Sequence, residues 1–241
     1  MSGIHIGTSG WAYSSWKPEF YPPKTAASKF LAYYATHLNS VEVNYTFRAR
    51  PTAKMLNGWC EVTPQDFRFA VKAHQRITHI KRLKDVAGDV TEFYRSIAPL
   101  ASAGRLGPVL FQLPPFPKID EPRLKSFLES LPSEAAAALE FRNASWFTMS
   151  VYELLRRHNA ALCIAESDKL EVPEVITADF AYFRFRCSEY SDAALKQIER
   201  RLATAARSCE VYAFLKHEET PEGALNARRL LERLRPERAA A

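Results

Sequence analysis

The sequence predicts a single (β/α)8 barrel of the TIM type, with residues 1–241 forming one domain. The chain has 241 residues, close to the roughly 250 residues of a typical barrel of this class. Strand-like and helix-like segments alternate along it about eight times, which indicates parallel strands joined by crossover helices. The first strand-like segment is followed by Gly-Thr-Ser-Gly rather than by GxGxxG. A barrel is therefore favoured over an open dinucleotide-binding sheet.

Short apolar segments bounded by glycine, proline or polar residues are expected to form the strands. They cover residues 4–6, 41–47, 67–74, 109–114, 137–142, 161–166, 181–186 and 211–216. Gly107 and Pro108 precede the fourth of these segments, and Pro114 with Pro115 ends it. The spacing of these segments leaves room for a helix in nearly every connection.

Apolar residues at helical spacing predict the helices of these connections. Phe30, Leu31 and Tyr34 share one face of the first, and Pro51 marks the start of the second at Thr52. The expected helical segments are 24–38, 78–83, 90–103, 123–131, 151–158, 192–207 and 224–234, together with the second helix, which begins at residue 52. Residues 170–176 have no helical period and contain a proline. We therefore expect the outer helix after the sixth strand to be short or missing.

The composition is that of a globular chain with a surplus of basic residues. The formal net charge is +6, which favours anionic partners, including phosphates and nucleic acid, in a general way. The four cysteines are far apart and form no CxxC pair, so a zinc knuckle or a disulfide framework is improbable. The sequence contains no signal-peptide pattern and no apolar stretch of roughly 20 residues. We expect a cytoplasmic protein that does not enter a membrane, and the oligomeric state is not predicted.

Polar and charged residues recur near the end of almost every predicted strand, which is where barrels of this class carry their sites. Alternation along a strand places them on the face opposite their apolar neighbours. They are Glu42, Asn44, Lys72, His74, Gln112, Glu140, Arg142, Glu166, Arg184, Arg186 and Lys216. Because an unpaired buried charge is costly, we expect an internal ion-pair network around a hydrated mouth.

The loop after the first strand adds a group of aromatic residues to this mouth. Gly7 and Gly10 break the strand, and Trp11, Tyr13 and Trp16 follow within a few residues. Loops on a rigid scaffold often carry ligand sites, so we expect these three residues to roof the cavity. Phe20 and Tyr21, which lie further along the chain, fit a site and a small core under the loop equally well.

Roles can be assigned to these residues by their chemistry. We assign acid–base chemistry to Glu42, Lys72 and Glu140, without dividing acid from base. Arg142, Arg184 and Arg186 suit an anionic ligand such as a phosphate or carboxylate. His74 and the glutamates are acceptable metal ligands, but the neighbouring cations would repel a divalent ion. We therefore predict no bound metal and no cofactor.

Several segments together resemble one family, the uncharacterised YecE-like family, which is a domain of unknown function numbered seventy-two. The segments are 6–22, 41–47, 69–79, 111–116, 140–146 and 182–186. The resemblance implies a TIM-type barrel and supplies no reaction. The residues that match the family's motifs are Gly7, Thr8, Ser9, Gly10, Trp11, Tyr13, Trp16, Glu42, Asn44, Lys72, Gln112, Glu140, Arg142, Trp146 and Arg184. Asn44, Gln112 and Trp146 join the expected ligand-binding residues on this ground.

The sequence departs from the family pattern at two places and leaves the function open. Arg186-Cys187 and Lys216-His217 stand where the family commonly has His-Gly and an Asn-Asn or Asn-Asp step, so both departures make the mouth more basic. One hypothesis is an enzyme that acts on a small or nucleotide-like anion. The second is a nucleic-acid-binding or phosphodiester-processing barrel, by fold analogy alone. The third is a ligand sensor without catalysis.

Overall fold

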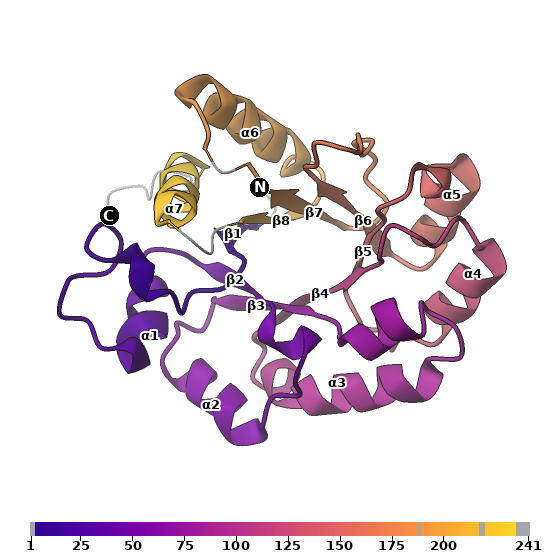
Figure 1. Ribbon diagram of the computed structural model, residues 1–241, viewed down its shortest axis with the longest axis horizontal. Helices are drawn as coiled ribbons and strands as arrows, with labels where there is room; N and C mark the ends of the chain where they lie inside the picture. The colour runs from indigo at the N-terminus through magenta and orange to yellow at the C-terminus, as the bar shows by residue number, and fades with distance from the viewer. Residues whose placement is uncertain (1–2, 188, 217–219, 235–241) are drawn as a thin grey trace.

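The protein forms an eight-stranded parallel barrel surrounded by helices (Figure 1). The computed structural model describes residues 3–187, 189–216 and 220–234. The strands are β1 Ile4–Thr8, β2 Ser40–Val43, β3 Arg68–Lys72, β4 Leu106–Gln112, β5 Ala137–Glu140, β6 Ala160–Ala165, β7 Phe180–Phe185 and β8 Glu210–Leu215. Their order is β1-β8-β7-β6-β5-β4-β3-β2, and each hydrogen-bonded pair is parallel. The predicted fold is thereby confirmed.

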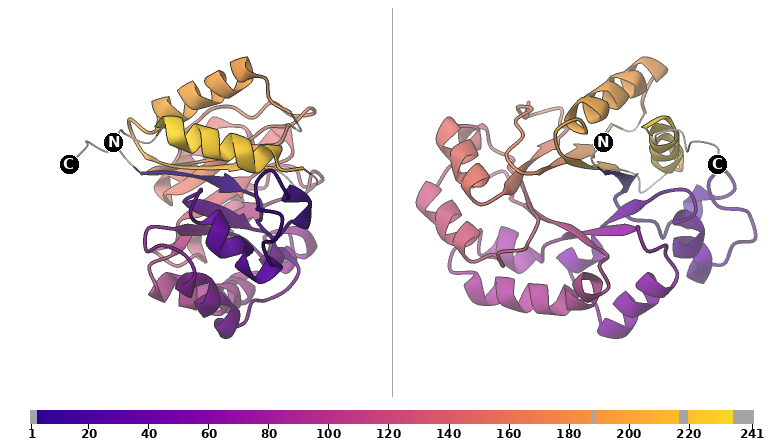
Figure 2. Two further views of the ribbon diagram at one scale, coloured as in Figure 1. Left: turned by 90° about the vertical axis from the view of Figure 1, so that its left-hand side faces the viewer. Right: turned by 180° about the vertical axis from the view of Figure 1, so that it is seen from behind.

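The helices form an outer ring, which Figure 2 shows from two further sides. They are α1 Phe30–Tyr34, α2 Ala53–Glu61, α3 Ala87–Ser102, α4 Glu121–Glu129, α5 Met149–Arg157, α6 Asp192–Ala205 and α7 Glu222–Leu234. Side chains of Thr52, Asp120, Thr148 and Ser191 cap four of them by accepting a backbone N–H of the first turn. These caps explain where those helices begin, because the first N–H groups have no partner inside the helix. No helix of the described residues is long and apolar enough to cross a membrane.

The connection from β6 to β7 contains no helix, as the irregular 170–176 segment predicted. Other boundaries differ from the expected ones. The predicted helix 24–38 is reduced to a short 3-10 segment, Ala27–Lys29, and α1. The third strand ends at Lys72 rather than at residue 74, and the fourth begins earlier, at Leu106.

The predicted strand 41–47 is wrong in its second half, because β2 ends at Val43 and a 3-10 turn, Tyr45–Phe47, follows. The hydroxyl of Thr46 donates to the backbone carbonyls of Val43, at 3.2 Å, and Lys72, at 2.7 Å. These bonds draw the chain across the end of β3. Asn44 consequently lies in the turn and not on the strand.

The inside of the barrel combines small and large side chains. Alanines on β3, β5 and β6 face aromatic residues on β7 and β8, and all are buried. The main members are Ala70, Ala138, Ala161, Ala165, Phe180, Tyr182, Tyr212 and Phe214. A larger apolar cluster fills the space between the strands and the helices. Above the inner cluster, at the carboxyl ends of the strands, the side chains become polar.

Strands β1 and β2 stand at the two ends of the hydrogen-bonded strand order, and side chains bridge them. The Asn39 amide nitrogen donates to the Ile4 carbonyl at 2.7 Å, and its oxygen accepts from the Ile6 N–H at 2.9 Å. One asparagine thus takes the place of a backbone ladder at this seam of the barrel.

Tyr34 makes a second bridge at the same seam. Its hydroxyl accepts from the Thr8 N–H at 2.8 Å and donates to the Ser40 carbonyl at 2.9 Å. The two strands approach so closely at Gly7 that a Cβ there would lie 1.9 Å from the Ser40 carbonyl oxygen. Only glycine fits at that position without a backbone shift.

Replacing Asn39 by alanine should weaken this seam. We expect Asn39→Ala to lower the free energy of unfolding by about 2 kcal/mol, because two hydrogen bonds of roughly 1 kcal/mol each are lost. Urea unfolding measures the change, with Asn57→Ala on the exposed face of α2 as the control. Equal stabilities of the two variants would contradict the bridging role of Asn39.

Candidate functional site

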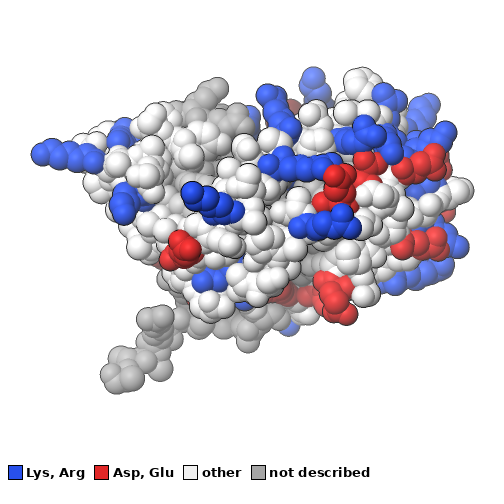
Figure 3. Space-filling model, turned by 90° about the horizontal axis from the view of Figure 1, so that it is seen from below, with Lys and Arg blue, Asp and Glu red and all other residues white. Residues whose placement is uncertain are grey.

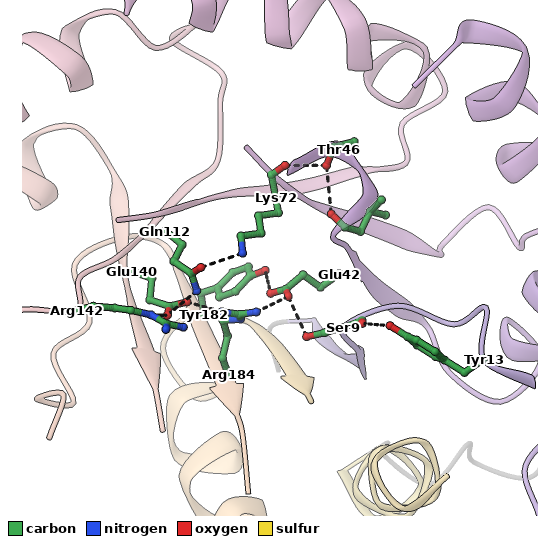
Figure 4. A network of polar contacts seen from close by, with 11 residues as sticks. Ser9, Tyr13, Glu42, Thr46, Lys72, Gln112, Glu140, Arg142, Tyr182 and Arg184 are labelled. Carbon is green, nitrogen blue, oxygen red and sulfur yellow. Dashed lines mark hydrogen bonds and ion pairs between the residues drawn. The ribbon is translucent and has the colours of Figure 1, made fainter. Parts of the chain in front are cut away.

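The guanidinium of Arg184 lies between two carboxylates at the carboxyl ends of the strands (Figure 4). Its Nη2 donates to Glu42 Oε1 at 2.8 Å, and its Nη1 donates to Glu140 Oε2. Arg184 comes from β7, Glu42 from β2 and Glu140 from β5. Arg184 is only 4% exposed, Glu140 2% and Glu42 0%. The three side chains therefore form an ion-pair bridge across the inside of the barrel.

Every oxygen of the two carboxylates accepts at least one hydrogen bond. The hydroxyls of Ser9 and Tyr182 donate to Glu42 at 2.9 and 2.8 Å. The Gln112 amide and the Arg142 Nε both donate to Glu140 Oε1, each at 2.8 Å. Such complete pairing is what makes two buried carboxylates tolerable.

The titration behaviour of these groups follows from their surroundings. Burial alone would raise the pKa of Glu140, but the guanidiniums of Arg184 and Arg142 outweigh it and lower that pKa to about 2. Burial, followed by the charge of Glu42, raises the pKa of Tyr182. Burial would lower the pKa of Arg184, but Glu42 and Glu140 raise it well above its usual value. Near neutral pH, Glu140 and Arg184 are therefore charged and Tyr182 is a hydrogen-bond donor.

Lys72, at the end of β3, is held differently from the arginines. Its Nζ donates to Gln112 Oε1 at 2.8 Å and lies over the Phe47 ring, 4.4 Å from the ring centre. Burial, followed by the charge of Arg184, lowers the pKa of Lys72 to about 8, although Glu42 and Glu140 act in the opposite direction. Lys72 therefore exchanges its proton close to neutral pH, which suits acid–base chemistry.

A cavity of about 950 Å³ opens beside this network, among the ends of β5 to β8 and the loops that follow them. Glu140 and Arg142 form part of its wall, together with Glu166, Arg186 and Lys216. Another cavity of about 950 Å³ lies outside the barrel, between α6 and the outward faces of β6 and β7. It is remote from the strand ends, so the first cavity is the candidate site.

Two arginines offer hydrogen-bond donors to this cavity. The Arg142 side chain is 39% exposed and uses its Nε for Glu140. The Nη1 of Arg186 is buried and has no hydrogen-bond partner among the described residues. Glu166 accepts hydrogen bonds from the Arg186 backbone N–H and the Tyr190 hydroxyl. Its hydrogen bond to Arg186 is thus to the backbone and not to the guanidinium.

Half of the twelve predicted site residues meet in one network. It contains Glu42, Lys72, Gln112, Glu140, Arg142 and Arg184, and Arg186 lies on the adjoining cavity wall. The two glutamates lie inside this network with their oxygens occupied, so Lys72 is the better placed of the three predicted acid–base residues to exchange a proton. Asn44 is half-buried in the turn after β2, and its Oδ1 has no partner among the described residues.

Two of the predicted ligand-binding tryptophans are instead core residues. Trp16 is 0% exposed and packs among Tyr13, Phe20 and Tyr21. Trp146 is 3% exposed and stacks on Phe141. Both lie inside apolar clusters because burial of a large aromatic ring is strongly favourable, and neither reaches the cavity.

The predicted aromatic roof over the mouth is likewise not formed. Trp11 is half-buried and packs edge-on against Trp59, with ring centres 5.2 Å apart. The Tyr13 hydroxyl donates to the Ser9 carbonyl at 3.1 Å. Neither ring lines the candidate cavity. The opening loop serves the site through Ser9, whose hydroxyl holds Glu42.

Sequence reasoning missed Ser9 and Tyr182 as members of the network. Tyr182 could have been found from the sequence, because it lies two positions before Arg184 on β7 and shares its inward face. Ser9 was named only as a match to the family's motif, and its position after a glycine-rich turn did not indicate a role in the network. His217, which departs from the family pattern, lies outside the described residues.

The nearly closed order of eight parallel strands and the charged residues at the strand ends define a TIM-type barrel protein with a polar mouth. The chain belongs to the DUF72 family, described as a protein of unknown function, whose model matches residues 5–241. The family resemblance read from the sequence is thereby confirmed.

Curated relatives share part of this chain. It is 35% identical over 157 residues to the UPF0759 protein YunF of Bacillus subtilis strain 168, covering 62% of this chain and 54% of that protein. It is 35% identical over 145 residues to the UPF0759 protein YecE of Escherichia coli K12, covering 60% of this chain and 50% of that protein. The chain thus spans about half the length of the curated relatives it matches.

Solved structures agree with the barrel. A DUF72 family protein from Thermotoga maritima has a TM-score of 0.86 and 30% identity, covering 96% of this chain and 99% of that one. A DUF72 family protein from Enterococcus faecalis has a TM-score of 0.79 and 19% identity, covering 97% of this chain and 98% of that one. An AP endonuclease, family 2, from Brucella melitensis has a TM-score of 0.53 and 8% identity, covering 98% of this chain and 100% of that one. This similarity is one of fold alone.

Removing the cation between the two glutamates should destabilise the protein severely. In Arg184→Met the carboxylates of Glu42 and Glu140 remain buried without it, so we expect a loss of about 3–5 kcal/mol of stability. The triple variant Glu42→Gln, Glu140→Gln, Arg184→Met should recover most of this loss, because no buried carboxylate is left without a cation. Urea unfolding measures both.

The matched control is Arg186→Met, two residues along the chain, whose guanidinium makes no ion pair among the described residues. It should cost less than about 1 kcal/mol, since no buried carboxylate loses its partner. If Arg184→Met were as stable as Arg186→Met, the bridge would have no structural role.

Proposed function

We propose that the protein binds a small anionic ligand, carrying a phosphate or a carboxylate, in the cavity beside the Arg184 bridge. The observation that carries this proposal is the buried, unpartnered Nη1 of Arg186 on the cavity wall. A buried donor without a partner is costly, and an anion in the cavity satisfies it. Arg142, whose Nη atoms make no hydrogen bond within the described residues, supplies further donors beside it.

The charges of the cavity wall are consistent with such a ligand. Arg142, Lys169, Arg186 and Lys216 contribute four cations, while Glu140, Glu166, Asp168 and Glu189 contribute four acids. Glu140 is paired with Arg184 and with the Nε of Arg142, and Glu166 accepts the Arg186 N–H and the Tyr190 hydroxyl. Arg142 and Arg186 are therefore left as the donors best suited to a phosphate or carboxylate.

The size of the cavity also supports a small ligand. A volume of about 950 Å³ falls within the roughly 300–1,000 Å³ of ordinary ligand pockets. The basic residues do not form an uninterrupted track on the flank that carries α2 and α3, where acidic side chains lie among them (Figure 3). The size of the cavity therefore favours a small anion, and this flank offers no continuous basic track to a nucleic acid.

Catalysis is favoured over passive sensing because of Lys72. Its pKa of about 8 lets it give and take a proton near neutral pH. Gln112 connects it by hydrogen bonds to Glu140, which lies on the cavity wall. A binding protein has no need of a lysine with a lowered pKa at this position.

Anion binding is tested by titration with inorganic phosphate and with sulfate at constant ionic strength. We expect both anions to raise the melting temperature, and Arg186→Met to weaken binding about tenfold or more, since a charge-assisted hydrogen bond contributes about 1.5–3 kcal/mol. Arg48→Met, an exposed arginine after β2, is the control and should bind as the wild type does.

Calorimetric titration of the same variants gives the dissociation constants directly. Equal affinity of Arg186→Met and Arg48→Met would contradict the proposed site. So would a rise in melting temperature that chloride reproduces at the same ionic strength, because that effect is general screening.

A further inference from the structure

The mouth holds more cations than its buried carboxylates can pair. Glu42 and Glu140 are taken by Arg184, and Arg142 adds a second bond to Glu140. Lys72 contacts neither carboxylate, and its hydrogen-bond acceptor is the amide oxygen of Gln112. Lys72 is therefore the network cation without an acidic partner, although it lies close to both acids.

The orientation of Gln112 is fixed by its two partners. Its nitrogen donates to Glu140 Oε1 at 2.8 Å, so its oxygen faces Lys72 Nζ, also at 2.8 Å. The reverse orientation would set its oxygen against a carboxylate and its N–H groups against an ammonium. An amide oxygen accepts from a neutral amine as well as from an ammonium. Gln112 thus positions Nζ without demanding that it be charged.

The backbone at Lys72 is also fixed. Its carbonyl accepts the Thr46 hydroxyl at 2.7 Å, and its ammonium lies over the Phe47 ring. Both contacts come from the turn after β2 and hold the side chain at the strand end. A nucleophile held in this way loses little conformational entropy when it reacts.

A row of three hydrogen bonds connects Lys72 to the proposed anion site. It runs from Lys72 through Gln112 and Glu140 to Arg142, with 2.8 Å at each step. Arg142 lies on the wall of the cavity. Figure 4 shows Lys72 and Arg142 at the two ends of this row.

We infer that Lys72 is a nucleophile that forms an imine with a carbonyl compound bearing a carboxylate or phosphate. This inference rests on the proposed anion site, and it names the class of ligand. The neutral amine attacks the carbonyl carbon, a C–N bond forms, and the oxygen is protonated. Loss of water from the carbinolamine then gives the protonated imine.

The reaction balances without any oxidant or reductant. A lysine ammonium and a carbonyl give a protonated imine and one water, so the positive charge at Nζ is the same before and after. Glu42 and Glu140 therefore face the same net charge before and after the reaction. The lowered pKa of Lys72, about 8, supports this role, because a neutral amine is the reactive form.

Two other lysines, Lys169 and Lys216, line the cavity itself and are exposed. They make the assignment testable, since any lysine near a bound carbonyl compound can react. Neither is held by an amide and an aromatic ring as Lys72 is. The position of the adduct therefore distinguishes an oriented nucleophile from an incidental one.

The experiment is reductive trapping with sodium cyanoborohydride. The protein is incubated with glyoxylate, with pyruvate or with dihydroxyacetone phosphate, and intact mass and peptide mapping follow. We expect at least one of these probes to give one reduced adduct per chain, on Lys72, with a rate that rises through about pH 8. Lys72→Arg should lose it while keeping its melting temperature, and the exposed Lys125→Arg should keep it.

The choice of probe distinguishes a carboxylate ligand from a phosphate ligand. Absence of an adduct with all three probes, or adducts on Lys169, Lys216 or scattered surface lysines, would overturn the inference. If phosphate still raises the melting temperature in an Arg186-dependent manner, the anion site stands and the imine alone is wrong. If phosphate has no effect either, both proposals fail.

Discussion

The placement of one guanidinium between two buried carboxylates is the constraint on which the mouth of this barrel depends. Arg184 joins β7 to β2 and β5 through Glu42 and Glu140. Its two partners also accept bonds from Ser9, Tyr182, Gln112 and Arg142, so the strands β2, β4, β5 and β7 and the loops after β1 and β5 meet at one point. A bridge of this kind is stable only when every charge has a partner. The small side chains below it leave room for the aromatic rings of β7 and β8.

The same bridge determines which groups remain for chemistry. Because the buried acids are occupied, Lys72 has an amide as its acceptor. Arg142 and Arg186 line a cavity, and Arg186 Nη1 has no hydrogen-bond partner among the described residues. Desolvation and the nearby Arg184 charge then lower the pKa of Lys72 to about 8. The proposals thus separate structure from reactivity: the glutamates and Arg184 hold the fold, Arg142 and Arg186 bind the anion, and Lys72 reacts.

The sequence predicted the network better than its surroundings. Period-two alternation was sufficient to place Glu42, Lys72, Glu140 and Arg184 on inward faces, because parallel strands bring their late positions together. It could not tell a buried tryptophan from an exposed one, so it did not show that Trp16 and Trp146 lie in the core. It also could not show that Thr46 would turn the chain after Val43, nor that Asn39 would bridge β1 and β2. These outcomes depend on contacts between distant segments.

The most direct test of this account is an NMR titration of the lysine side chains, with Lys72→Arg to assign the resonance. We predict that one lysine titrates near pH 8 and that its signal is missing from the variant. A Lys72 that titrates near the ordinary value of about 10.4 would contradict the claim that the bridge leaves this amine without an acidic partner.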